Sequence, residues 1–309
     1  MSSRYLTSPR GAALESRLWP TVRLFGGLFG IPAGCGVVIA VSAALDVPIV
    51  AALAIGVMIL SMLTATVLQW VYIFGSTSRL RKAEEHLRGG SLAVAVGFAQ
   101  WVLARVFRAD FRTRAFYVLA LAAERAGDFA DAAYLFRCAM RALPAFAGKS
   151  HAVRLRALAA SHEAFALAAC GRDAEAERAL AVAHGALPLL GQRGLLEALD
   201  DPALGPLSMN ATLSDIEGRR DPRAVATLAG ALLAWKRRDP QRALNAFTGE
   251  AQMLSYNTLP HEQHLLARLE ASSIAMLGGA QYRGGAVVGA GSVDPATDAW
   301  VSAVLGQTS

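Results

Sequence analysis

The sequence predicts an all-α protein in which a transmembrane helical hairpin precedes an α-solenoid, a stack of helix pairs. Three observations lead to this fold class. Two long apolar runs without charge lie near the start, the remainder is rich in alanine with helical periodicity, and one pattern of large and small residues recurs along it. Of 309 residues 54% are hydrophobic and only 17% are charged, against about a quarter in soluble domains. This balance suits a chain that lies partly in lipid.

The membrane hairpin is predicted from two apolar runs. After a basic segment, residues 1–23, residues 24–45 and 47–78 contain no charged side chain, and only Asp46 separates the runs. A helix needs about 20 apolar residues to span the hydrocarbon core. We therefore expect two spans, at about 24–45 and 48–74, within a hairpin region of residues 24–78.

The charges that flank the hairpin predict its orientation. Arg17 and Arg23 precede it, Arg79 and Arg81 follow it, and no basic residue lies between the two runs. By the positive-inside rule both termini are cytoplasmic in a multi-pass inner or plasma membrane protein. The Ala- and Arg-rich composition suggests a bacterial inner membrane. A cleaved signal peptide is the alternative for the first run, although its length exceeds the usual signal core of about 7 to 15 residues.

Three glycines form a strip along the first predicted span. Gly26, Gly30 and Gly34 repeat every four residues, which lets another helix backbone approach closely. Two interpretations follow, namely packing within the hairpin and a seam for homo-oligomers. Neither span carries an ionisable group, which argues against a transporter.

Residues 113–144 carry the clearest repeat. Two Ala-rich amphipathic halves flank Gly127 and Asp128, bulky Phe116 and Phe136 alternate with alanines, and Pro144 closes the unit. This arrangement resembles the tetratricopeptide repeat, a helix–turn–helix module of about 34 residues. The resemblance implies a binding or scaffolding domain. A generic Ala-rich helical bundle is the alternative.

Further copies define the repeat domain, residues 79–277. A second copy follows 44 residues later, with Gly171 at the turn, after a connection predicted at 145–155. A third has its turn at Asp239 and Pro240, and a weaker one begins at Arg79 with its turn at Gly89 and Gly90. An irregular insertion is predicted at about 190–220, a capping helix at 261–277, and a Gly-rich tail at 278–309 with a short helix near 297–305.

A concave face of such a stack would be lined by the first helix of each unit, as the resemblance implies. We expect a groove for a protein partner, a hydrophobic peptide or a helix. Four charged residues, Arg114, Glu124, Arg125 and Lys236, would stand at its rim. The alternative is that the lining residues pack against neighbouring repeats or against the tail. The predicted lining residues are Tyr117, Leu121, Phe165, Leu228, Leu232 and Trp235.

Chemical motifs are not found. Gly148 and Lys149 lack the earlier glycine of a phosphate-binding loop, and His261 and His264 lack the spacing and third ligand of a zinc site. The three cysteines show no metal or disulfide spacing. The net charge of +6 reflects the basic membrane flank, so no nucleic-acid partner is expected. We expect no catalytic residue, no cofactor and no metal, and therefore no enzyme.

These inferences lead to one functional hypothesis and one alternative. The hypothesis is a membrane-anchored scaffold or adaptor that mediates protein–protein interactions at the cytoplasmic face. The alternative is a structural or assembly subunit of a larger membrane protein complex.

Overall fold

The computed structural model describes residues 4–6, 30–45, 47–106, 108–143, 149–190, 221–278 and 294–306. Within these ranges the chain is helical and forms no strand, which confirms the all-α prediction. The helices are η1 (Arg4–Leu6), α2 (Ile31–Ala44), α3 (Pro48–Arg88), α4 (Leu92–Arg105), α5 (Ala109–Arg125), α6 (Phe129–Ala142), α7 (Lys149–Ala169), α8 (Asp173–Ala186), η3 (Leu187–Leu190), α11 (Pro222–Lys236), α12 (Pro240–Gly249), α13 (Ala251–Asn257), α14 (Pro260–Met276) and α15 (Pro295–Leu305).

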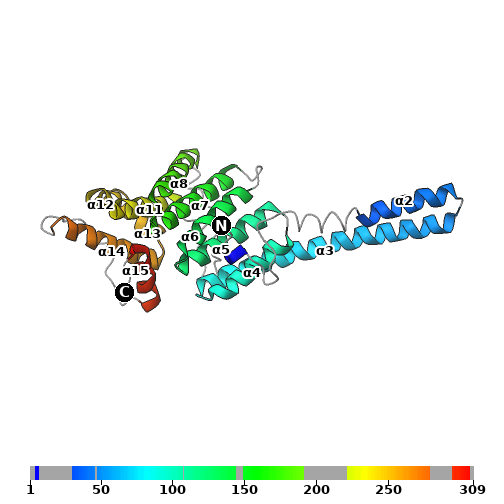
Figure 1. The fold of residues 1–309 in the computed structure, drawn as a ribbon, viewed down its shortest axis with the longest axis horizontal. Coiled ribbons are helices and arrows are strands. Elements are labelled where there is room, and N and C mark those ends of the chain that lie inside the picture. The colour runs from blue at the N-terminus through cyan, green and yellow to red at the C-terminus, as the bar shows by residue number, and fades with distance from the viewer. Residues whose placement is uncertain are drawn as a thin grey trace.

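Helices α2 and α3 form an arm that projects from the helical body (Figure 1). They lie side by side, and α3 continues from the arm into the body without a break (Figure 1). Most of the exposed large apolar side chains of the described residues lie between Val37 and Phe74. Burial begins abruptly beyond them, because Leu80, Ala83 and Leu87 of the same helix are fully buried.

The body consists of helix pairs that share one turn geometry. In α3–α4, α5–α6 and α7–α8 the turn residue is a glycine with positive φ, namely Gly90, Gly127 and Gly171. In α11–α12 the same position is Arg238, with φ of 58°. A left-handed residue after a helix lets the next backbone N–H reach back to the helix end. Those reverse bonds are Ser91 N–H to His86 O, Asp128 N–H to Ala123 O, Arg172 N–H to Leu167 O and Asp239 N–H to Ala234 O, at 2.9, 2.9, 2.9 and 3.0 Å.

A small residue follows each turn at the same offset and lets the two helices approach. Ala95, Ala132, Ala176 and Ala243 are all buried, five positions after the turn residue. The weaker copy proposed from Arg79 therefore has the same local geometry as the other three. One boundary was wrong: α7 begins at Lys149, so most of the connection predicted at 145–155 is helix. The predicted insertion lies mostly outside the described residues.

Side chains link successive helix pairs. Arg114 of α5 donates to both carboxylate oxygens of buried Glu84 on α3, at 2.5 and 2.6 Å. Arg137 of α6 donates to Glu163 of α7 at 2.6 to 2.8 Å. Because these contacts join neighbouring pairs, the pairs form one continuous body rather than separate hairpins.

The predicted terminal helices are present, and η1 returns to the body. The capping helix predicted at 261–277 is α14, and the short helix predicted near 297–305 is α15. In η1, buried Tyr5 donates its hydroxyl to Asp128 at 2.5 Å and accepts from Gln100 through its carbonyl at 2.9 Å. Burial, followed by the bond to Asp128, raises the pKa of Tyr5 to about 12. Both η1 and α15 therefore lie against the body, while the arm extends away from it (Figure 1).

Candidate functional site

The side chains predicted to line a groove mostly lie inside the body. Tyr117, Leu121, Phe165, Leu228 and Leu232 are buried, and Trp235 is half-buried. The indole N–H of Trp235 donates to Ser272 of α14 at 3.0 Å. The packing alternative describes the five buried side chains. Of the predicted residues, Phe165 and Trp235 also lie near the C-terminal helix α15.

Trp300 of α15 is the centre of an aromatic site. Its indole stacks on Phe165, with ring centroids 6.0 Å apart and planes 22° apart. Phe129 of α6 and His261 of α14 approach it edge-on, at 6.4 and 4.9 Å. The indole N–H donates to the backbone carbonyl of Glu124 at 2.8 Å. Four helices therefore surround the Trp300 side chain, and its one polar atom, the indole nitrogen, is hydrogen-bonded. We call the four residues that hold this indole, Glu124, Phe129, Phe165 and His261, the Trp300 seat.

The rest of α15 follows the same surface. Val301, Val304 and Leu305 are buried with Trp300, on one face of the helix at the spacing that an amphipathic helix requires. At its first turn Asp294 accepts from the N–H groups of Ala296 and Thr297 and from the Thr297 hydroxyl. These bonds, that of the Thr297 side chain first, hold the pKa of Asp294 below its usual value.

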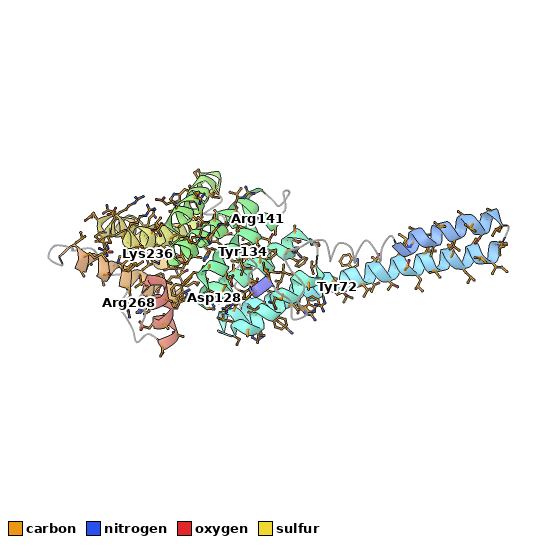
Figure 2. All side chains as sticks on the ribbon, in the orientation of Figure 1. Tyr72, Asp128, Tyr134, Arg141, Lys236 and Arg268 are labelled. Atoms are coloured by element: carbon orange, nitrogen blue, oxygen red, sulfur yellow. The ribbon has the colours of Figure 1, made fainter. Side chains whose placement is uncertain are left out.

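An ion pair fixes the register of α15 on α14. Asp298 pairs with Arg268, and His264 lies 4.0 Å from the same carboxylate oxygen. Arg268 of α14 lies close to α15 (Figure 2). This pair is half-exposed, so it contributes orientation more than stability.

A buried acid–imidazole pair lies beneath the Trp300 seat. His162 Nδ1 lies 3.1 Å from a Glu124 carboxylate oxygen, and both side chains are buried. The imidazole stacks on Phe136 at 5.0 Å and meets the edge of Tyr117 at 6.0 Å. The prediction that Glu124 stands at a groove rim was wrong, because its carboxylate has a partner inside the body. Tyr117 is therefore buried beside this pair and does not face solvent.

The other predicted rim residues make contacts between helix pairs. Arg125 donates to the carbonyl of Leu87, and Lys236 donates to the carbonyl of Ala169 at 2.7 Å. Burial lowers the pKa of Lys236. Lys236 also lines an open pocket of about 420 Å³ with Trp235 and Leu305. Two of the three predicted aromatic residues therefore lie near α15, Phe165 at Trp300 in its middle and Trp235 near Leu305 at its end.

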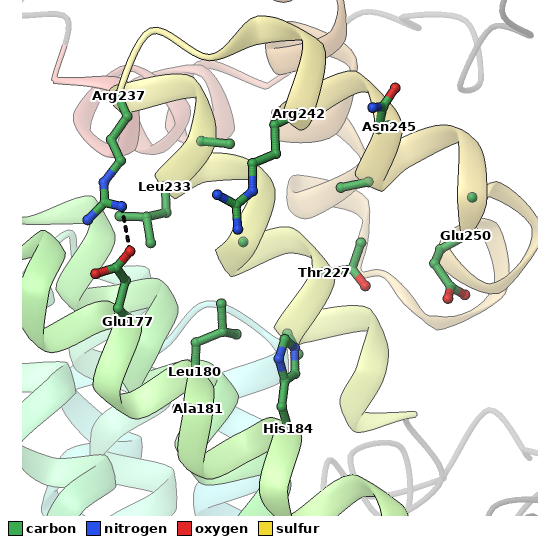
Figure 3. Close-up of a pocket in the computed structure, with 15 residues that line it drawn as sticks. Glu177, Leu180, Ala181, His184, Thr227, Leu233, Arg237, Arg242, Asn245 and Glu250 are labelled. Atoms are coloured by element: carbon green, nitrogen blue, oxygen red, sulfur yellow. Dashed lines mark hydrogen bonds and ion pairs between the residues drawn. The ribbon is translucent and has the colours of Figure 1, made fainter.

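A second pocket, of about 580 Å³, lies between α8, α11 and α12 (Figure 3). Leu180, Gly230 and Leu233 contribute its apolar lining. Arg237 and Glu177 form an ion pair at one end, and Arg242 points into the space from α12 (Figure 3). Its mixed charges favour no particular ligand. Within the described ranges no group of three or more His, Cys, Asp or Glu residues could hold a metal ion.

The glycine strip on α2 does not face α3. A Cβ added at Gly30 or Gly34 would meet no atom within 4 Å, so these positions are not filled by hairpin packing. Gly26 lies outside the described residues. The surface predicted for helix–helix packing is thus open in the structure of a single chain.

The junction between arm and body carries aromatic and basic side chains together. The guanidinium groups of Arg79 and Arg105 lie over the Trp101 ring, at 3.7 and 4.6 Å from its centroid. Tyr72 lies beside Trp101, with ring centroids 6.3 Å apart, where α3 leaves the body (Figure 2). Tryptophan, tyrosine and arginine at such a boundary are typical of a membrane–water interface.

By length and composition, α3 is the one helix of the described residues that could cross a membrane, while α2, in the first apolar run, is a shorter apolar helix. Comparison of the chain with protein-family models, curated proteins and solved structures finds no match.

Proposed function

We propose that the protein is a membrane-anchored scaffold whose tetratricopeptide-like helix pairs form an α-solenoid that binds a protein partner at the cytoplasmic face. The observation that carries the proposal is the change in side-chain exposure along α3. Its apolar side chains are exposed up to Phe74 and buried from Leu80 onward. An exposed apolar surface of that extent marks contact with lipid or another protein.

The position of η1 supports a two-span anchor. Residues before the arm and residues after it both contact the body, through Tyr5 and through α4. A chain that leaves the body and returns to it crosses a bilayer an even number of times. This agrees with spans at about 24–45 and 48–74 and with cytoplasmic termini.

Reporter fusions in a bacterial host test this topology. Alkaline phosphatase, which is active only outside the cytoplasm, is expected to be active when fused after Leu45 and inactive when fused after Ser309. Green fluorescent protein fused at the same two positions should give the opposite pattern. Equal phosphatase activity at both positions would contradict the hairpin.

The helix pairs support partner binding because their shared turns and small residues resemble those of helical repeat stacks, which present extended surfaces. The full chain in mild detergent is expected to retain a specific membrane or cytoplasmic protein. Trp235→Ala, which removes a half-buried ring, should reduce that retention, while Phe74→Ala on the arm should not. If neither substitution nor any other in the body changes what is retained, the scaffold function is contradicted.

The second candidate, a subunit of a larger membrane assembly, is favoured by the open glycine strip. Gly30→Leu would fill the strip, and Gly56→Leu on α3 is the matched control. Loss of a cross-linked oligomer or complex with Gly30→Leu alone would support assembly through α2. Unchanged cross-links would exclude that surface.

A further inference from the structure

The surface occupied by α15 has the properties of a binding site for a helix. Its parts come from four segments, α5, α6, α7 and α14, and it holds a tryptophan by stacking, by edge contacts and by one carbonyl acceptor. An ion pair at Asp298 sets the register. Buried aromatic anchors with a polar pair at the rim are the usual composition of an interaction hot spot.

Helix α15 depends on this surface for its order. It has eleven residues, and isolated helices of that length are marginal in water. Its apolar face consists of four residues, Trp300, Val301, Val304 and Leu305, which become exposed if the helix leaves. Binding of α15 and its folding are therefore one event, and another helix with the same face can compete for the surface.

Sequence position makes α15 an internal competitor. It follows α14 after residues 279–293, a connection of 15 residues of which five are glycine. Such a connection gives a tethered segment an effective concentration of the order of millimolar. A partner must compete with this tethered helix. Its apparent affinity is therefore its intrinsic affinity multiplied by the fraction of chains whose seat is open.

We propose that the Trp300 seat is the partner-binding site of this protein and that α15 is its internal ligand, displaced by an amphipathic helix of similar chemistry. The partner helix carries a tryptophan, aliphatic residues one, four and five positions later, and a carboxylate two positions before it. This proposal rests on the partner-binding function proposed above and names the partner's chemistry.

The test uses the full chain in detergent micelles and a fluorescein-labelled synthetic peptide of residues 292–309 as probe. Wild type is expected to bind the peptide weakly, because its own α15 competes. Trp300→Ala weakens the internal ligand and leaves the seat intact, so it should bind the peptide at least about tenfold more tightly. Ala303→Ser, at an exposed position of the same helix, should behave as wild type.

A charge exchange provides a second variant outside the core. Arg268→Asp places two carboxylates together, which weakens the binding of the internal α15 and of the wild-type peptide alike. This variant is expected to bind a peptide with Asp298→Arg at least about tenfold more tightly than the wild-type peptide, with the reverse preference in the Trp300→Ala chain. A role of α15 in stability alone would not produce such exchanged specificity.

Three results would overturn the proposal. Trp300→Ala and Arg268→Asp chains that fold, as judged by circular dichroism, yet bind neither peptide would show that α15 is a permanent part of the body. Binding without the charge preference would place the peptide elsewhere. A doubled mass caused by exchange of α15 between chains would assign the seat to a second copy. In each case retention of a partner through Trp235 would still support the scaffold function itself.

Discussion

Between Pro48 and Phe74, α3 presents its large apolar side chains outward, whereas between Leu80 and Leu87 it buries them against α4 and α5. The backbone is the same uninterrupted helix in both regions. The surroundings therefore differ, not the local conformation: protein covers the apolar side chains of the second region, and those of the first region are exposed in the single chain. Residue composition follows this division, since Arg79 and Arg81 appear where the exposed apolar surface ends.

The strongest way to separate the two regions is to truncate one phenylalanine in each. Phe136 of the body is fully buried, while Phe74 of the arm is 66% exposed. Phe136→Ala is expected to reduce the free energy of unfolding by about 3–5 kcal/mol, through lost burial and the resulting cavity. Phe74→Ala should leave the thermal unfolding of the body in detergent unchanged. Equal losses would contradict the division.

A charge in the arm tests which environment covers it. Leu60 is 66% exposed, so Leu60→Arg would be nearly neutral in a protein that stays in water. In a membrane the substitution is expected to disfavour insertion by about 2.5–3.5 kcal/mol. The measurement is the membrane-bound fraction after alkaline extraction, with Val94→Arg on the exposed side of α4 as control. A membrane-bound fraction unaffected by Leu60→Arg would count against a spanning helix.

The turns of the body distinguish its helix pairs from one another. Gly127 has φ of 78° and no neighbour near an added Cβ, whereas Arg238 holds φ of 58° with a side chain. A left-handed conformation costs a residue with a Cβ about 1–2 kcal/mol. Gly127→Ala should therefore lower the free energy of unfolding by about 1 kcal/mol, and Arg238→Gly should raise it by up to about 1 kcal/mol. Chemical denaturation checks both, and changes of the same sign would refute a common turn.

Acid should affect α15 before it affects the arm. The pKa of Asp294 is lowered in the folded state, so its contribution is present above the unfolded value of 3.8 and is lost as pH falls below it. Residues 47–78 contain no ionisable group with a charge to lose. A small loss of order in α15 is expected near pH 3, seen as a shift of the Trp300 resonance in fluorotryptophan NMR. Asp294→Asn should remove that pH dependence.

Local features were predictable from the sequence, and distant contacts were not. The turn at Gly89 and Gly90 could be predicted because glycine and alanine spacing determines how closely two adjacent helices approach. The role of Trp300 could not, since its acceptor at Glu124 lies 176 positions away and no local pattern encodes that pairing. Glu124 was placed at a rim for the same reason: its burial depends on His162, which belongs to another helix pair. The helix near 297–305 was predicted, but its location on the body was not.

The corner between α5 and α6 receives both ends of the described chain. Tyr5 bonds to Asp128 there, 123 positions away, and Trp300 bonds to Glu124. Contacts between residues so far apart in sequence form slowly, because the loops they close must be ordered first. During synthesis the N-terminal contact becomes available once α6 has emerged from the ribosome, and the C-terminal contact only after the last helix is complete. The corner between α5 and α6 therefore acquires its last contacts only when both ends of the described chain are in place.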